Sequence, residues 1–318
     1  MAKSNNNTHK EHYIPQFFIK QFYAANDKGV IDEKKSCVFC YDLQKFTTHP
    51  AHSEDIFFVE NLYETAAINE NLKNNLIQEG EIDASKINYF EHKFRAIESE
   101  ANYRFKKLLQ KCAKSQHKDK VLSCKDVDYF TNYMILQLLR IPQFLQIQRD
   151  ALCEVLSEGG APVSSNTITE TAAKHFILEQ LFGADLPKLI RKTIVDSHDM
   201  CIVKMEAGQS FFSSNTPVFF FEYDGKSNVF ETAHIAFPIS PQYCIHYSQK
   251  KSDIHDKQMH KRLFCGDEKN PVFPAFSKDT IHAMREASPL YNKIFTDKYL
   301  PNVIEKWESL KTITLSEK

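Results

Sequence analysis

Glycine is scarce in this sequence, with only 8 among 318 residues. Folds that bind nucleotides on a parallel sheet usually place glycines at their phosphate-binding turns, so the scarcity argues against such a fold. The sequence also lacks a P-loop, a G-x-G-x-x-G string, an H-E-x-x-H string and an EF-hand loop. It therefore gives no support to binding of nucleoside triphosphates, dinucleotides or calcium, or to zinc-protease activity.

Long apolar runs and a strong net charge are missing as well. No segment approaches the roughly 18 apolar residues that cross a bilayer, and the first ten residues are polar and rich in asparagine, unlike a signal peptide. The formal net charge is −1, which by itself indicates no polyanionic partner. We therefore expect a cytoplasmic protein without a membrane partner, whose eight mostly separated cysteines are reduced thiols.

Aromatic residues are abundant, with 25 Phe and 13 Tyr against a single Trp, and they indicate a core of bulky rings between helices. Apolar residues step by three or four between Ile87 and Leu108, which predicts a long amphipathic helix. A second helix is predicted to begin near residues 123–125 and to kink or end at Pro142. Further helices are expected over residues 144–156, 166–198 with a break near 183–187, 277–295 and 302–310.

Strand-forming residues occupy shorter segments. An extended entry and a short helix are expected around Pro15, and strands over residues 36–43, 200–205, 210–212, 218–223 and 243–247. Because strands flank the helices instead of alternating with them, the pattern predicts an α+β fold. We expect a mainly helical block with a small, mostly antiparallel sheet from the N-terminal strand and the 200–250 region. Residues 1–10 are predicted to be disordered and residues 11–318 to form a single domain.

Five short strings follow one another in a recognisable order: HYIPQFFIKQF at 12–22, VENLY at 59–63, LLRIPQF at 138–144, FFSSNTP at 211–217 and FPISP at 237–241. Together they resemble the bacterial domain-of-unknown-function family 4238. The family opens with a pair of histidines, and Glu11 stands in place of the first of them. Asn215 and Thr216 stand where the family has Asp and Asn. The resemblance implies no activity, since none is established for the family. Some members lie among bacterial defence genes, which implies a role in antiviral defence.

His12 is the candidate catalytic residue. A histidine titrates near neutral pH and can serve as a general base, and the H-x-x-P string at residues 12–15 is similar to the first motif of His-Asn-His nucleases. The alternative is that His12 bonds a backbone carbonyl and orients the N-terminal segment.

A zinc site is the less favoured interpretation of Cys37, Cys40, His49 and His52. The residue types suit zinc, but only eight residues separate the two pairs, against about twelve in common zinc fingers. The alternative is a strand that happens to contain two cysteines, and we assign no metal ligand.

The candidate substrate-binding residues are Ser213, Ser214, Asn215 and Thr216, together with Arg140. The polar segment 213–216 lies between aromatic segments and offers hydrogen bonds to a ligand, or else satisfies its own backbone as a turn. Arg140 lies in an apolar helix and needs an anionic partner, which is either a structural carboxylate or a bound ligand.

Two basic segments, 104–120 and 249–262, could neutralise phosphates or could be solvated faces. The sequence thus supports two hypotheses. The first is a nucleic-acid-directed effector in antiviral defence, in its enzymatic form a nuclease that uses a divalent metal and His12 as base, with nucleic acid or another defence protein as partner. The second is a non-catalytic module that binds a ligand or a protein.

Overall fold

The structure describes part of the chain. The computed structural model describes residues 10–25, 31–32, 34–45, 47–60, 62–63, 89–158, 176–183, 185–205, 209–221, 228–250, 263–265 and 293–297. The disorder predicted over residues 1–10 falls on residues outside this set, except for Lys10, which begins a strand. The helix over 302–310, most of the helix over 277–295 and most of the basic segment 249–262 also lie outside the described residues.

The strands that the structure describes form three sheets. A two-stranded sheet pairs β1 (Lys10–His12) with β4 (Phe58–Glu60). A five-stranded sheet has the order β10-β5-β9-β8-β7, and a four-stranded sheet has the order β3-β2-β11-β6. The five-stranded sheet consists of β5 (His198–Lys204), β7 (Phe219–Phe221), β8 (His234–Pro238), β9 (Tyr243–Gln249) and β10 (Leu263–Cys265). The four-stranded sheet consists of β2 (Val38–Asp42), β3 (Thr47–Ala51), β6 (Ser213–Ser214) and β11 (Lys293–Thr296).

The α+β class and the mostly antiparallel pairing are confirmed, since among the described pairs only β10 and β5 run parallel. The N-terminal strand β2 does not extend the sheet of the 200–250 region as expected from the sequence. It pairs with β3 and β11, and only the two-residue strand β6 of that region joins its sheet.

The helices predicted between residues 87 and 158, and the described residues of the one predicted over 166–198, are present with small changes of boundary. The long amphipathic helix is α3 (Tyr89–Lys114), and α4 (Cys124–Leu139) begins after the N-cap Ser123. It ends before Pro142, which opens α5 (Pro142–Glu158), because proline lacks the N–H that a helix interior needs and fits its first turn. Residues 176–183 are helical, and the other helices are α1 (Gln16–Lys20), α7 (Asp185–Ser197) and α8 (Val229–Thr232).

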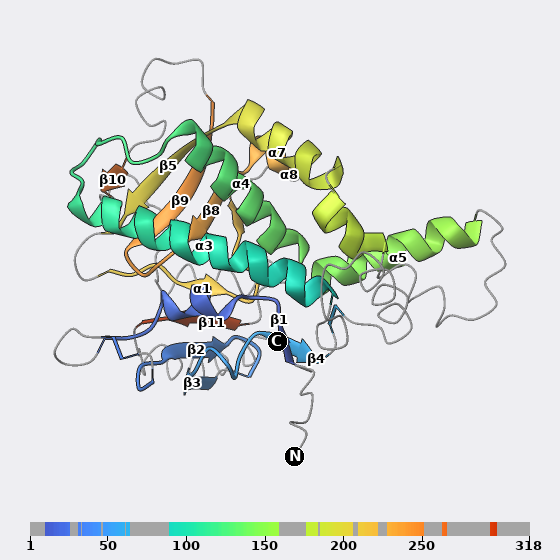
Figure 1. The fold of residues 1–318 in the computed structure, drawn as a ribbon, viewed down its shortest axis with the longest axis horizontal. Helices are drawn as coiled ribbons and strands as arrows, with labels where there is room; N and C mark the ends of the chain where they lie inside the picture. Colours follow the sequence, from blue (N-terminus) through green and yellow to red (C-terminus); the bar gives the residue numbers. More distant parts are fainter. Residues whose placement is uncertain are drawn as a thin grey trace, which may run out of the picture.

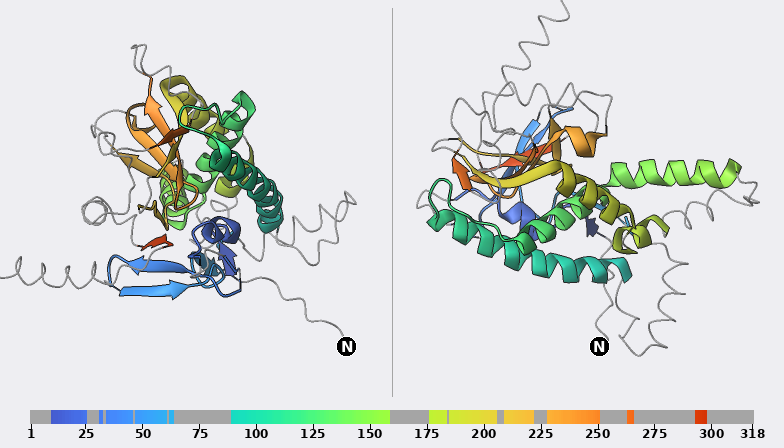
Figure 2. Two further views of the ribbon diagram at one scale, coloured as in Figure 1. Left: turned by 90° about the vertical axis from the view of Figure 1, so that its left-hand side faces the viewer. Right: turned by 90° about the horizontal axis from the view of Figure 1, so that it is seen from above.

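The elements form layers. Helices α3 and α4 cover one face of the five-stranded sheet, and the sheet of β2, β3 and β11 lies on the other side of α1 (Figures 1 and 2). Successive side chains of β9 point to opposite faces of the sheet. On one face, Ile245 and Tyr247 belong to the large apolar core that includes the helices. On the other face, Cys244 belongs to a second apolar cluster with Tyr41 and Ile294. The five-stranded sheet is therefore buried on both faces.

The aromatic side chains of α1 and of the residues directly after it connect the layers. Phe18 stacks on Phe237 of β8 with centroids 5.3 Å apart, and Phe22 meets Phe295 of β11 edge-on at 5.2 Å. All four side chains are buried, and burial of one such ring contributes about 1.5–3 kcal/mol. The predicted aromatic core is thus the contact that fixes the N-terminal segment, and with it His12, against β8 and β11.

Two expectations from the sequence need correction, one for a helix and one for a strand. Residues 293–295 were predicted to end a helix, but they belong to β11, where pairing with β2 and β6 overrides the local preference. The strand expected at residues 210–212 is displaced to Ser213–Ser214, because these two residues, and not the phenylalanines before them, pair with Ile294 and Phe295.

Candidate functional site

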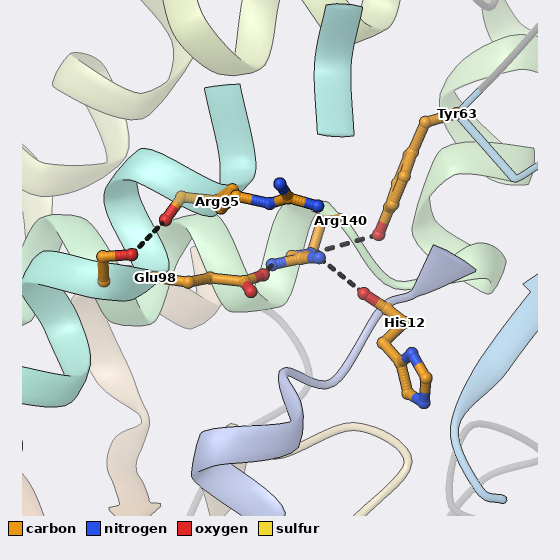
Figure 3. Close-up of polar contacts among 6 residues, drawn as sticks. His12, Tyr63, Arg95, Glu98 and Arg140 are labelled. Atoms are coloured by element: carbon orange, nitrogen blue, oxygen red, sulfur yellow. Dashed lines mark hydrogen bonds and ion pairs between the residues drawn. The ribbon is translucent and has the colours of Figure 1, made fainter. Parts of the chain in front are cut away.

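Arg140 is the centre of a buried polar network at the end of α4. It is the C-cap residue of that helix, and its side chain is only 1% exposed. The guanidinium donates from Nη1 to Glu98 Oε1 at 2.7 Å, from Nε to the Tyr63 hydroxyl at 3.1 Å and from Nη2 to the carbonyl oxygen of His12 at 2.6 Å (Figure 3). It also lies over the ring of Phe94 at 4.1 Å.

These contacts tie together four segments that are distant in the sequence. His12 comes from β1, Tyr63 from the segment after β4, Glu98 from α3 and Arg140 from α4. Burial raises the pKa of Tyr63 to about 12, so the hydroxyl stays protonated while it accepts from Arg140. Glu11 adds a further link, because its buried carboxylate accepts from the backbone N–H of Tyr63 at 2.6 Å. The network fixes the position of β1.

The imidazole of His12 points away from Arg140 (Figure 3). It packs on Phe58 with ring centroids 5.7 Å apart, and its Nε2 is buried without a hydrogen-bond partner. Burial lowers the pKa of His12, against the raising effect of the backbone of Ser53 and Glu54. The ring is therefore neutral at neutral pH and can either accept or donate a hydrogen bond.

A polar cavity of about 270 Å³ lies between β1, α1 and α3. It is lined by His12, Gln16, Phe17, Glu91, Phe94, Arg95, Glu98, Ser99 and Asn102. The α3 residues share one side of the helix because they follow one another at intervals of three and four. Burial, and then the nearby carboxylate of Glu98, raise the pKa of Glu91. The side-chain oxygen of Asn102 is buried and has no hydrogen-bond partner.

The lining can therefore offer a ligand several kinds of contact. His12 supplies a neutral imidazole, Asn102 an amide acceptor and Glu91 a carboxyl whose proton is held more tightly than usual. Arg95 is exposed and brings a cation to the same cavity. An imidazole and a carboxyl in one cavity are suited to ligand recognition and to proton transfer.

The other predicted residues, 213–216, lie elsewhere. All four side chains are buried, and Ser213 and Ser214 pair with β11. The Ser214 hydroxyl donates to the carbonyl of Thr216 at 2.5 Å and accepts from its N–H at 3.0 Å, while Asn215 Oδ1 accepts from the N–H of Lys293 at 3.1 Å. These contacts form a Ser/Thr turn locked to a neighbouring strand. The turn does not line the cavity of His12.

The structure thus brings together His12 and Arg140 but not the serine turn. Their link runs through the His12 backbone, which sequence reasoning had no means to find. It also missed Glu91, Glu98 and Asn102. The available signal was their spacing on the polar side of α3, but such a side is usually only solvated.

The cysteine and histidine pairs are split between two strands and the segments around them. Cys40 on β2 lies opposite His49 on β3. Among the residues that the structure describes, no three or more His, Cys, Asp or Glu side chains are grouped so that they could hold a metal ion. The thiols of Cys37, Cys40, Cys112, Cys124, Cys201 and Cys244 are free.

Fold and site together define an α+β protein with a polar cavity where its N-terminal strand meets a long helix. The sequence matches the profile of the family described as "Protein of unknown function (DUF4238)" over residues 10–287, so the chain belongs to this family and the resemblance is confirmed. Searches of the curated proteins and of the solved structures gave no match. None of the described helices combines the length and apolar character needed to cross a bilayer.

Proposed function

We propose that this protein is a ligand-binding module and that the cavity between β1, α1 and α3 takes a compact polar molecule. One observation carries the proposal: two residues that line the cavity, His12 and Asn102, each have a buried polar atom without a hydrogen-bond partner. A buried polar atom left unpaired costs about 1–3 kcal/mol. A ligand that pairs with both atoms recovers this free energy.

The lining indicates the chemistry of the ligand. The Asn102 oxygen requires an N–H or O–H donor, and Glu91 favours the same kind of group, whereas the exposed Arg95 suits an acidic or carbonyl group. A volume of about 270 Å³ is slightly below the range of drug-sized pockets, roughly 300–1,000 Å³. We therefore expect a compact molecule with both donors and acceptors, such as an amino acid, a sugar or a nucleoside.

The enzymatic hypothesis has less support from the geometry. It requires His12 and the polar turn at 213–216 to share a cavity with a carboxylate, and only His12 and the carboxylates do so. Nuclease chemistry with a divalent metal, a cytoplasmic location and a role in antiviral defence stay proposals that follow from sequence reasoning.

The test is a thermal-melting screen of the purified protein against amino acids, sugars, nucleosides, nucleotides and divalent metals. A ligand that binds only the native state raises the melting temperature, and the rise grows with the logarithm of the ratio of its concentration to its Kd. We expect at least one compact polar compound to stabilise the wild type, and its affinity to fall at least about tenfold in Asn102→Leu, which removes the unpaired acceptor and fills the cavity.

Gln110→Leu is the matched control, because it makes a similar amide-to-leucine change at an exposed position of the same helix. This variant is expected to bind like the wild type. If no compound stabilised the wild type, or if Asn102→Leu bound as tightly as Gln110→Leu, the proposal would be wrong.

A further inference from the structure

The C-terminal half of α3 presents a basic face that the cavity does not use. Residues 103–114 contain one arginine and four lysines and no acidic residue. Tyr103, Lys106, Lys107, Lys111 and Lys114 are all exposed. Their spacing of three, four and seven residues places them on one side of the helix. The opposite side, with Phe105 and Leu108, is buried in the core.

The carboxylates closest in sequence do not neutralise these lysines. Glu100 pairs with Arg104 at 2.8 Å, Asp119 accepts from the N–H of Gln116, and Asp126 belongs to the capping box of α4. Among the described contacts, none joins a carboxylate to any lysine of this face, and Lys111 donates to the carbonyl of Val121. The face is therefore positive although the whole chain carries a formal net charge of only −1.

The helix dipole does not account for the whole face. Cations are favoured in the last turn of a helix, which covers Lys111 and Lys114. Lys106 and Lys107 lie about two turns before the end of α3, beyond the reach of that effect. Tyr103 lies about one turn further back, and its ring is 65% exposed beside these lysines. An exposed aromatic ring beside several lysines suits a partner that carries both planar rings and anionic groups.

We propose that this face, made of Tyr103, Lys106, Lys107 and Lys114, binds single-stranded nucleic acid. The lysines meet phosphates, and the tyrosine ring stacks on a base, which is accessible in a single strand but not in a duplex. Lys107 and Lys114 are about 11 Å apart along the helix axis, so one strand can contact both. An anionic membrane is a poorer partner, because the apolar side that a membrane-bound helix would insert is already buried here.

Fluorescence anisotropy with labelled DNA and RNA single strands of about 20 nucleotides tests this inference. The wild type is expected to bind single strands more tightly than the matching duplex, with affinity that falls as salt rises. Lys106→Glu/Lys107→Glu is expected to weaken binding at least about tenfold and to lower the salt slope by about 0.7 for each lost phosphate contact. Tyr103→Ala is expected to weaken binding roughly 5- to 150-fold, the range for one stacked base.

The control is Lys188→Glu/Lys192→Glu, which reverses the same two charges at exposed positions of α7. It changes the net charge equally and is expected to keep more than half of the wild-type affinity, and circular dichroism confirms the fold of each variant. The inference is overturned if single strands do not bind, if the control loses as much affinity as the double variant, or if anionic phospholipid vesicles bind this face and oligonucleotides do not. The face lies on the part of α3 beyond the cavity residues, so its failure would leave the proposed ligand site untouched.

Discussion

Arg140 shows how a single buried charge can organise a fold. Its three nitrogen atoms each contact a different segment, and it has a half-buried carboxylate, Glu98, as counter-ion. A buried ion pair adds little net stability compared with an apolar replacement of both partners. Removal of one partner, however, leaves the other charge buried without a counter-ion. The site of His12 therefore depends on a residue that does not line the cavity.

We expect Arg140→Leu to lower the free energy of unfolding by about 3–5 kcal/mol, because Glu98 then has no counter-ion and the carbonyl of His12 no side-chain donor. Urea denaturation measures this change. Arg149→Leu removes a more exposed pair, Arg149 with Asp150 at 3.6 Å, and is expected to cost less than about 1 kcal/mol. Similar losses in the two variants would show that the Arg140 network is not structural.

Among the elements, α4 has the most complete local start signal. Ser123 Oγ accepts from the N–H of Asp126 at 3.2 Å, and the Asp126 carboxylate accepts from the N–H of Ser123 at 2.8 Å. This reciprocal capping satisfies two N–H groups that the first turn of a helix leaves free. It also anchors the helix that carries Arg140 at its other end.

Ser123→Ala is expected to destabilise the protein by about 1 kcal/mol, within the range of roughly 0.5–2 kcal/mol for lost N-caps. The comparison is Ser115→Ala, which removes a hydroxyl that donates to the carbonyl of Lys111 near the end of α3 and is expected to change stability by less than about 0.5 kcal/mol. Both values come from urea denaturation. An unchanged stability of Ser123→Ala would mean that the cap contributes nothing.

Strand β11 is one of the elements for which local pattern failed. It has four residues, too few to reveal an alternation. In the fold, Ile294 contacts one apolar cluster and Phe295 the other. Such alternation arises only because β2 and β6 lie on either side, so the strand is a consequence of its neighbours.

At the scale of the whole molecule, one buried histidine, His198, and two half-buried ones, His12 and His246, link stability to pH. Burial lowers the pKa of His12 and of His198, and burial together with the charges of His234 and His198 lowers the pKa of His246 to about 3. Each folded-state value lies below the value near 6.5 of an unfolded chain. Below about pH 6.5 the unfolded chain therefore binds more protons than the folded one, and stability is lost as pH falls.

We expect the free energy of unfolding to fall between about pH 6.5 and pH 5 by roughly 1.4 kcal/mol per pH unit for each histidine that stays neutral in the fold. His246→Gln is expected to show a shallower dependence than the wild type. His117→Gln makes the same change at an exposed position and is the control. If urea denaturation gave equal slopes for the wild type and His246→Gln, the assignment of His246 would be wrong.

Repeating side-chain patterns were sufficient for the long helices α3, α4 and α5. The apolar stripe of α3, the cap at Ser123 and the break at Pro142 act over a few residues, so they can be recognised without the fold. The α+β class followed from the same patterns. Partner choice between strands could not be inferred, because it depends on contacts such as those of Tyr41 with Ile294, about 250 residues away in the chain.

His12 and Arg140 could each be singled out from the sequence, since His12 begins the H-x-x-P string and Arg140 is a charge in an apolar helix. Their relation was decided in three dimensions. Only packing of α1 and α4 against α3 aligns the His12 carbonyl with the Arg140 guanidinium and brings His12, Glu91 and Asn102 to one cavity. Side chains far apart in the chain meet through the burial of apolar surface, which acts without regard to sequence distance.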